Sequence, residues 1–143
     1  MLASMNGERD LGTLLRTLRP ILRDGAFVFC SFAGARYGDH AALDPIAAVS
    51  ESEGLTLVIP ASNAASAGLA DQPTFRCITL QVHSSLEAVG LTAAVSTALA
   101  RKAISANLVA GAFHDHVFVP ADRAEDALDV LQALAAEAGT PRN

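Results

Sequence analysis

Charged and aromatic side chains are scarce in this sequence. Its 143 residues include no tryptophan, one tyrosine and one lysine, and only 17% of the residues are charged. The nine arginines are scattered along the chain and the formal net charge is -5, which disfavours a nucleic-acid partner. Apolar residues make up 51% of the chain, enough for a folded core. The length fits one domain, or two very small domains packed together.

Long uninterrupted apolar runs are also lacking, and we expect no secretory leader. The longest uncharged stretch, residues 54–70, contains a proline, an asparagine and two serines, which is not typical of a membrane span. The N-terminus has no basic segment followed by an apolar run. We therefore expect a cytoplasmic protein with no membrane partner. The two cysteines, Cys30 and Cys77, lie in apolar runs and are expected to be buried free thiols.

Hydrophobic periodicity predicts alternating helices and strands. A leucine-rich stripe from Leu11 to Leu22 indicates an amphipathic helix that Pro20 should end or bend near Arg19. Glycines and polar residues predict a loop over 33–44. Strands are expected at 26–32, 45–50, 55–60, 74–83, 105–111 and 116–120, and further helices at 61–69, 90–104 and 121–139.

An internal repeat with a period of sixty residues runs through this pattern. "LTLVIPASNAASAGL" aligns with "DHVFVPADRAEDALD", which places Pro60 on Pro120 and Ala64 on Ala124. Each half would then contribute a hairpin, a proline and a helix that follows at once. The chance recurrence of strand, proline and alanine-rich helix is the alternative explanation.

The segments "HSSLEAVGLTAAVSTALA" and "HDHVFVP" resemble those of a family of bacterial proteins made of two ACT-like units. The resemblance covers nearly the whole chain and is strongest over 75–120. It implies an α+β, ferredoxin-like fold of two βαββαβ-type units packed together, residues 1–72 and 73–143. The first unit has a rearranged order, because its helix precedes its first strand and a loop replaces the crossover helix. ACT domains bind amino acids or other small molecules and regulate an attached enzyme, and we expect no attached enzyme domain here.

The residues from His83 to Leu91 also suggest a ligand site without reference to the family resemblance. The strand that ends at His83 leads into two serines, and the helix is expected to begin near Gly90, where a ligand could approach the backbone. Free N–H groups at a helix start attract a carboxylate, and Glu87 or Asp115 could pair with an ammonium group. Ser84 and Glu87 also fit a capping box, so the segment could be only a turn and a cap. The candidate ligand-binding residues are His83, Ser84, Ser85, Glu87, Val89, Gly90, Leu91, Asn107, His114, Asp115 and His116.

Other kinds of site are less well supported by the sequence. His114 and His116 would share one face of an extended strand, but two histidines are too few for a metal site, so we expect no metal and no cofactor. His83, Ser84 and Asp115 supply the residue types of a hydrolase triad, yet the chain has no GxSxG motif. A scaffold acting through oligomerisation is the third alternative. The preferred interpretation is a regulatory or sensor protein without catalytic activity that binds a small molecule, most simply an amino acid, and forms a homodimer or larger assembly.

Overall fold

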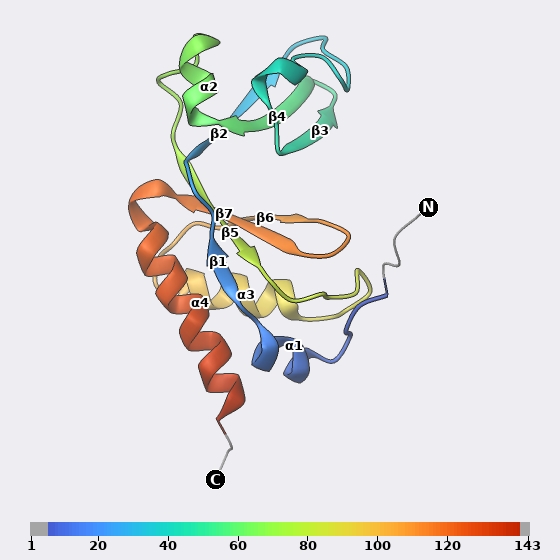
Figure 1. Cartoon of the computed structure of the whole chain (residues 1–143), viewed down its shortest axis with the longest axis vertical. Coiled ribbons are helices and arrows are strands. Elements are labelled where there is room, and N and C mark those ends of the chain that lie inside the picture. The colour runs from blue at the N-terminus through green and yellow to red at the C-terminus, as the bar shows by residue number, and fades with distance from the viewer. Residues whose placement is uncertain (1–5, 141–143) are drawn as a thin grey trace. The chain divides into compact units, whose positions relative to one another are not determined.

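The computed structural model describes residues 6–140, which form two compact units (Figure 1). We call residues 24–76 the central unit, and residues 6–23 together with 77–140 the split unit. The central unit is therefore inserted between two parts of the split unit in the sequence. The expected division into units 1–72 and 73–143 concerns the ACT-like repeats and stays a prediction.

The central unit is an antiparallel sheet with one short helix. Its strands are β2 (Phe27–Phe32), β3 (Ala47–Glu51), β4 (Gly54–Pro60) and the first residues of β5 (Phe75–Leu80), in the order β3-β4-β2-β5. The helix α2 (Ala61–Ser66) follows β4 directly, and a short 3-10 turn, η1 (Ala41–Leu43), lies in the loop between β2 and β3. The sequence predicted this loop in place of a crossover helix.

The split unit contains three helices and one 3-10 turn. Its strands are β1 (Pro20–Leu22), the rest of β5, β6 (Asn107–Ala110) and β7 (Asp115–Pro120). The sheet order is β1-β5-β7-β6. Helix α3 (Leu91–Ala100) connects β5 to β6, and β7 leads through the 3-10 turn η2 (Ala121–Arg123) into α4 (Ala124–Gly139). The N-terminal helix α1 (Leu11–Thr17) contacts both α3 and α4.

The strand β1 corrects one expectation from the sequence. Ile21 and Leu22 were assigned to the stripe of an amphipathic helix, but the helix ends at Thr17 and these residues pair with Thr79 and Ile78 of β5. The residue before a proline avoids the helical conformation, so Pro20 turns the chain into a strand rather than a bent helix. A strand from the N-terminal part of the chain thus completes the sheet built by the C-terminal part.

The sixty-residue repeat has a local structural counterpart. Pro60 and Pro120 each end a strand with nearly the same backbone angles, φ -55° and ψ 135° against φ -51° and ψ 136°. A helical segment follows each proline at once, and Ala64 and Ala124 at equivalent positions are both buried. The proline fixes φ at the point where strand turns into helix, so the same short sequence produces the same turn twice.

Each unit has its own apolar core. In the split unit, Ile78 and Leu80 of β5 lie in one buried cluster with Val117 and Val119 of β7 and with side chains of α1, α3 and α4. In a strand, side chains alternate between the two faces of the sheet. Asp115 therefore belongs to the helix-covered face that Val117 and Val119 occupy, whereas His116 belongs to the opposite face. This alternation decides which residues can reach the candidate site.

Within residues 6–140 no helix combines the length and the apolarity needed to cross a membrane.

Candidate ligand site

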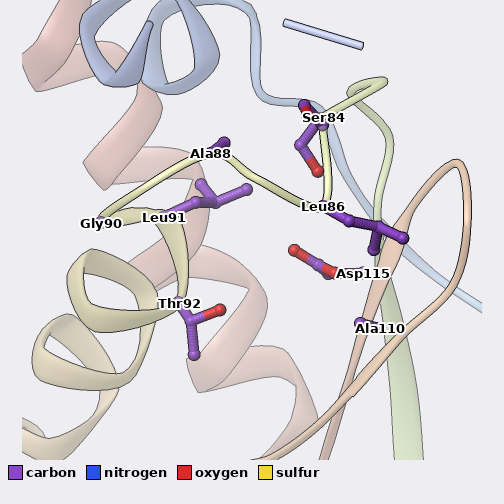
Figure 2. A pocket seen from close by; sticks show the side chains of 9 residues that line it. Ser84, Leu86, Ala88, Gly90, Leu91, Thr92, Ala110 and Asp115 are labelled. Carbon is purple, nitrogen blue, oxygen red and sulfur yellow. The ribbon is translucent and has the colours of Figure 1, made fainter. Parts of the chain in front are cut away.

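A pocket of about 180 Å³ lies in the split unit where the β5–α3 connection passes the β6–β7 hairpin (Figure 2). It is formed by the connection itself, the first turn of α3 and the adjoining ends of the two hairpin strands. The lining residues are Ser84, Ser85, Leu86, Ala88, Gly90, Leu91, Thr92, Ala110 and Asp115. Five of the eleven residues proposed from the sequence, Ser84, Ser85, Gly90, Leu91 and Asp115, are among them.

The N-terminus of α3 forms one side of this pocket. Gly90 is the residue before the helix and has no side chain to cap it, while Leu91 and Thr92 line the pocket. The first backbone N–H to bond within the helix is that of Ala94, which donates to the Gly90 carbonyl. The N–H groups of the first turn are therefore available to an anion, and the positive end of the helix dipole favours one.

Ser84 provides a second polar group in the pocket. It is the one buried polar residue within the described part of the chain, with 8% of its surface exposed. Its segment is fixed by the N-terminal chain, because the Glu8 N–H donates to the His83 carbonyl at 2.8 Å and the Ser85 N–H donates to the Glu8 carbonyl at 2.9 Å. Within residues 6–140 no hydrogen bond occupies the Ser84 hydroxyl, which is open to the pocket and available to a molecule there.

Asp115 provides the pocket's charge. Its side chain lies between Ser84 and Thr92 in Figure 2, and Ala110 is its direct cross-strand neighbour. Burial raises the pKa of this carboxyl, and the nearby His116 and His114 only partly oppose the effect. A half-buried carboxylate of this kind gains from a cationic partner. The pocket can therefore bind two groups of a ligand. The Asp115 carboxylate can pair with an ammonium group, and the start of α3 can bind a carboxylate.

The three histidines of the predicted site do not line the pocket. His116 faces the other side of the sheet, where its Nδ1 lies 3.0 Å from the Thr79 hydroxyl, and burial lowers the pKa of its ring. His114 precedes β7, and its Nδ1 lies 3.3 Å from the Val82 carbonyl. The ring of His83 packs at a tilt against Phe113, and its buried Nε2 has no partner among the described residues.

Three further candidates lie outside the pocket as well. Glu87 is an exposed residue that forms an ion pair with Arg9, with 3.4 Å between its Oε2 and the arginine Nη1. Val89 is 83% exposed and Asn107 is exposed at the start of β6. Of the two carboxylates that the sequence offered for an ammonium group, the structure therefore brings only Asp115 to the helix start.

The capping box predicted for Ser84 and Glu87 is wrong. The helix begins only at Leu91, and residues 86 and 87 form a turn in which the Ala88 N–H donates to the Ser85 carbonyl. The Ser85 hydroxyl, and not that of Ser84, accepts a hydrogen bond from the Glu87 N–H at 3.1 Å. Since Ser84 has no part in capping, its hydroxyl stays free for the pocket.

Gly90 has a structural role that differs from the expected one. Its φ is +104°, and a Cβ at this position would lie 2.9 Å from Cδ2 of Leu11 on α1. A side chain there would displace the end of the Leu11 side chain, and it would hold a backbone conformation that non-glycine residues avoid. The glycine is required by the helix start itself, whether or not a ligand approaches it.

Sequence reasoning missed four lining residues: Leu86, Ala88, Thr92 and Ala110. Thr92 could have been found, because it occupies the first turn of the helix whose N–H groups were proposed as the anion site. Ala110 could not, because its position follows only from the register of β6 and β7, which pairs it with Asp115. Small apolar residues carry no chemical signal in a sequence this rich in alanine.

Two other kinds of site were considered from the sequence, a metal site and a hydrolase triad. The described residues 6–140 contain no cluster of three or more histidine, cysteine, aspartate or glutamate side chains that could hold a metal ion. Within the same residues, no hydrogen bond joins His83 to Ser84 or Asp115, which a nucleophile and its base would need.

Family comparison supports the fold independently. Two family models, both described as ACT domain, match the chain in tandem over residues 6–77 and 74–133. A crystal structure of a Vibrio cholerae protein of unknown function, described as a possible transport protein, is 48% identical with a TM-score of 0.78. The match covers 87% of this chain and 95% of that one. A comparison with curated proteins gave no match.

More distant structures share the fold alone. The ligand-free regulatory subunit of aspartate kinase from Thermus thermophilus is 13% identical with a TM-score of 0.60, over 84% of this chain and 98% of that one. An Agrobacterium tumefaciens protein is 15% identical with a TM-score of 0.66, over 82% and 89% of the two chains. These structures and the two family models confirm the α+β, ferredoxin-like fold expected from the sequence, and the family models confirm the tandem arrangement. The chain belongs to the ACT-domain family.

Proposed function

We propose that this protein is a regulatory or sensor module that binds an amino acid in the pocket between the start of α3 and Asp115. The ACT-domain architecture over residues 6–133 supports a regulatory role. The observation that carries the proposal is the presence, in one small pocket, of open helix N–H groups and a desolvated carboxylate. An α-amino acid carries the complementary carboxylate and ammonium groups next to each other.

The two ends of the pocket give the ligand an orientation. The ligand carboxylate would accept hydrogen bonds from the first-turn N–H groups near Leu91 and Thr92, and its ammonium would donate to Asp115. Leu86, Ala88 and Ala110 would contact its apolar atoms. Each of these interactions holds the ligand and none activates it, so we propose binding without catalysis and without a cofactor.

Calorimetric titration with the twenty common amino acids tests the proposal. Asp115→Asn removes the counter-charge and should weaken binding about ten- to hundredfold, the loss of one charge-assisted interaction of roughly 1.5–3 kcal/mol. Ala110→Leu, which adds bulk opposite Asp115, should abolish binding. Glu87→Gln is the matched control, because it makes the same acid-to-amide change on a side chain outside the pocket.

The alternatives from the sequence give different results in the same experiment. A hydrolase using His83, Ser84 and Asp115 would consume an ester or amide substrate when one is added, and a scaffold would bind no amino acid. Failure of all twenty amino acids to bind the wild-type protein, or equal affinity in Asp115→Asn, would contradict the proposed function.

A further inference from the structure

We propose that the pocket is selective for a small amino acid with an uncharged, hydroxyl-bearing side chain, of the serine class. This inference rests on the proposed function and concerns the third group of the ligand, after its carboxylate and ammonium. Three observations carry it: the size of the pocket, the charges in its lining and the unbonded hydroxyl of Ser84.

Size limits the ligand first. The pocket holds about 180 Å³. One water molecule takes about 30 Å³ in the liquid, so the pocket accommodates roughly six water-sized groups. That is close to the size of alanine or serine and well below that of an aromatic amino acid. A long aliphatic side chain would also have to leave the pocket and stay in water.

The lining charges exclude acidic and basic side chains. Asp115 is the one ionisable residue in the lining, and no cation accompanies it. A second carboxylate on the ligand would be held near Asp115 without a compensating charge, which is unfavourable in a desolvated site. A second cation would compete with the ligand's own ammonium for the single carboxylate. The ligand side chain is therefore uncharged.

The Ser84 hydroxyl indicates which polar group the side chain of the ligand carries. Ser84 is 8% exposed, lines the pocket and has no hydrogen-bond partner for its hydroxyl within residues 6–140. The Ser85 hydroxyl, by contrast, already accepts from the Glu87 N–H. The hydroxyl of Ser84 can both donate and accept a hydrogen bond, and a ligand hydroxyl can do the same in return. Serine supplies that group at the size the pocket allows.

The test compares serine, alanine, aspartate and leucine by calorimetry on the wild-type protein and on Ser84→Ala. Serine should bind about three- to tenfold more tightly than alanine, the contribution of one neutral hydrogen bond. Aspartate and leucine should bind at least about tenfold more weakly than serine. In Ser84→Ala, serine should fall to the affinity of alanine while alanine is unchanged. Ser96→Ala is the matched control, because it makes the same change on α3 outside the pocket lining, and it should keep the preference for serine.

Two outcomes overturn the inference and can be told apart. Equal affinity for serine and alanine, or tighter binding of aspartate or leucine, would refute the selectivity while leaving the proposed amino-acid site intact. No binding by any of the four ligands, with none in the wider panel, would refute both. The ranking of ligands on the wild-type protein decides the matter even if Ser84→Ala does not fold.

Discussion

At the scale of single residues, the placement of Asp115 has opposite effects on stability and on binding. Burial raises the pKa of its carboxyl, so the ionised form is disfavoured in the folded protein without a ligand. The pKa of the Asp115 carboxyl is higher in the folded protein than in the unfolded chain. The free energy of unfolding therefore falls as the pH rises from the unfolded-state pKa through the folded-state pKa. An ammonium ligand reverses the balance by pairing with the ionised form.

Asp115→Asn should therefore raise the thermal stability of the ligand-free protein at pH 7 while weakening ligand binding. The amide has nearly the same shape and no charge to desolvate. Melting temperatures with and without amino acid check both effects, with Glu87→Gln as the exposed control. A lower melting temperature for ligand-free Asp115→Asn would show that the buried carboxylate is not a cost to the fold.

Binding should also depend on pH through the same residue. Protonated Asp115 cannot pair with an ammonium group, so affinity should fall as the pH is lowered through its raised pKa, and the fall should begin at a higher pH than for an ordinary aspartate. Titrations between pH 7.5 and about pH 4 measure this loss, and Asp115→Asn should abolish it. A pH-independent affinity in the wild-type protein would mean that Asp115 does not contact the ammonium.

Substitution of Gly90 should lower the stability of the fold, whether or not a ligand is bound. Gly90→Ala introduces a Cβ 2.9 Å from Leu11 at a φ of +104°, and we expect a loss of about 2 kcal/mol or more in the free energy of unfolding. Gly139→Ala is the control, because no atom lies within 4 Å of its Cβ position. Equal urea midpoints for the two variants would contradict this account of the helix start.

At the scale of elements, α4 holds the split unit together through its apolar stripe. Leu131 is fully buried in the cluster that joins α1, α3 and the sheet, whereas its neighbour Gln132 is exposed. Leu131→Ala should lower the free energy of unfolding by about 2–5 kcal/mol, and Gln132→Ala by less than about 0.5 kcal/mol. Chemical denaturation measures both, and similar midpoints would show that α4 is not part of the core.

The same elements show what could be predicted from the sequence. The proline-marked turns at Pro60 and Pro120 were predicted because proline fixes the backbone locally. The strand at Ile21 was missed because Leu14, Leu18 and Leu22 keep a helical spacing while β5, far along the sequence, supplies the partner. Ser84 and Asp115 were found from their chemistry.

The misplaced candidates have physical reasons of the same kind. His116 was assigned to the site because it is adjacent to Asp115, but strand alternation places it on the opposite face of the sheet. Glu87 was chosen for its charge, and its ion pair with Arg9 lies outside the pocket. Chemical type can be read from a sequence, whereas the direction of a side chain depends on where each strand begins.

At the scale of the whole molecule, exposed sheet edges favour self-association. β3 is an edge strand whose residues 48–51 are all exposed, and Val49 is 52% exposed. Unpaired strand edges are readily paired by another chain. We propose that the protein is a homodimer or a larger assembly. Light scattering at micromolar concentration should give at least twice the 14.8 kDa mass of the chain, and a stable monomer would contradict the proposal.

We propose that the amino acid binds with its carboxylate at the start of α3 and its ammonium at Asp115. Backbone amide NMR of the labelled protein during a titration with serine tests this most directly, because it reports the position of the ligand as well as its affinity. We predict that the largest shifts occur at the amides of Leu91 and Thr92 and at Ser84 and Asp115, and that they disappear in Asp115→Asn. Saturable shifts confined to residues outside the pocket, or no shifts with any amino acid in the panel, would contradict the account.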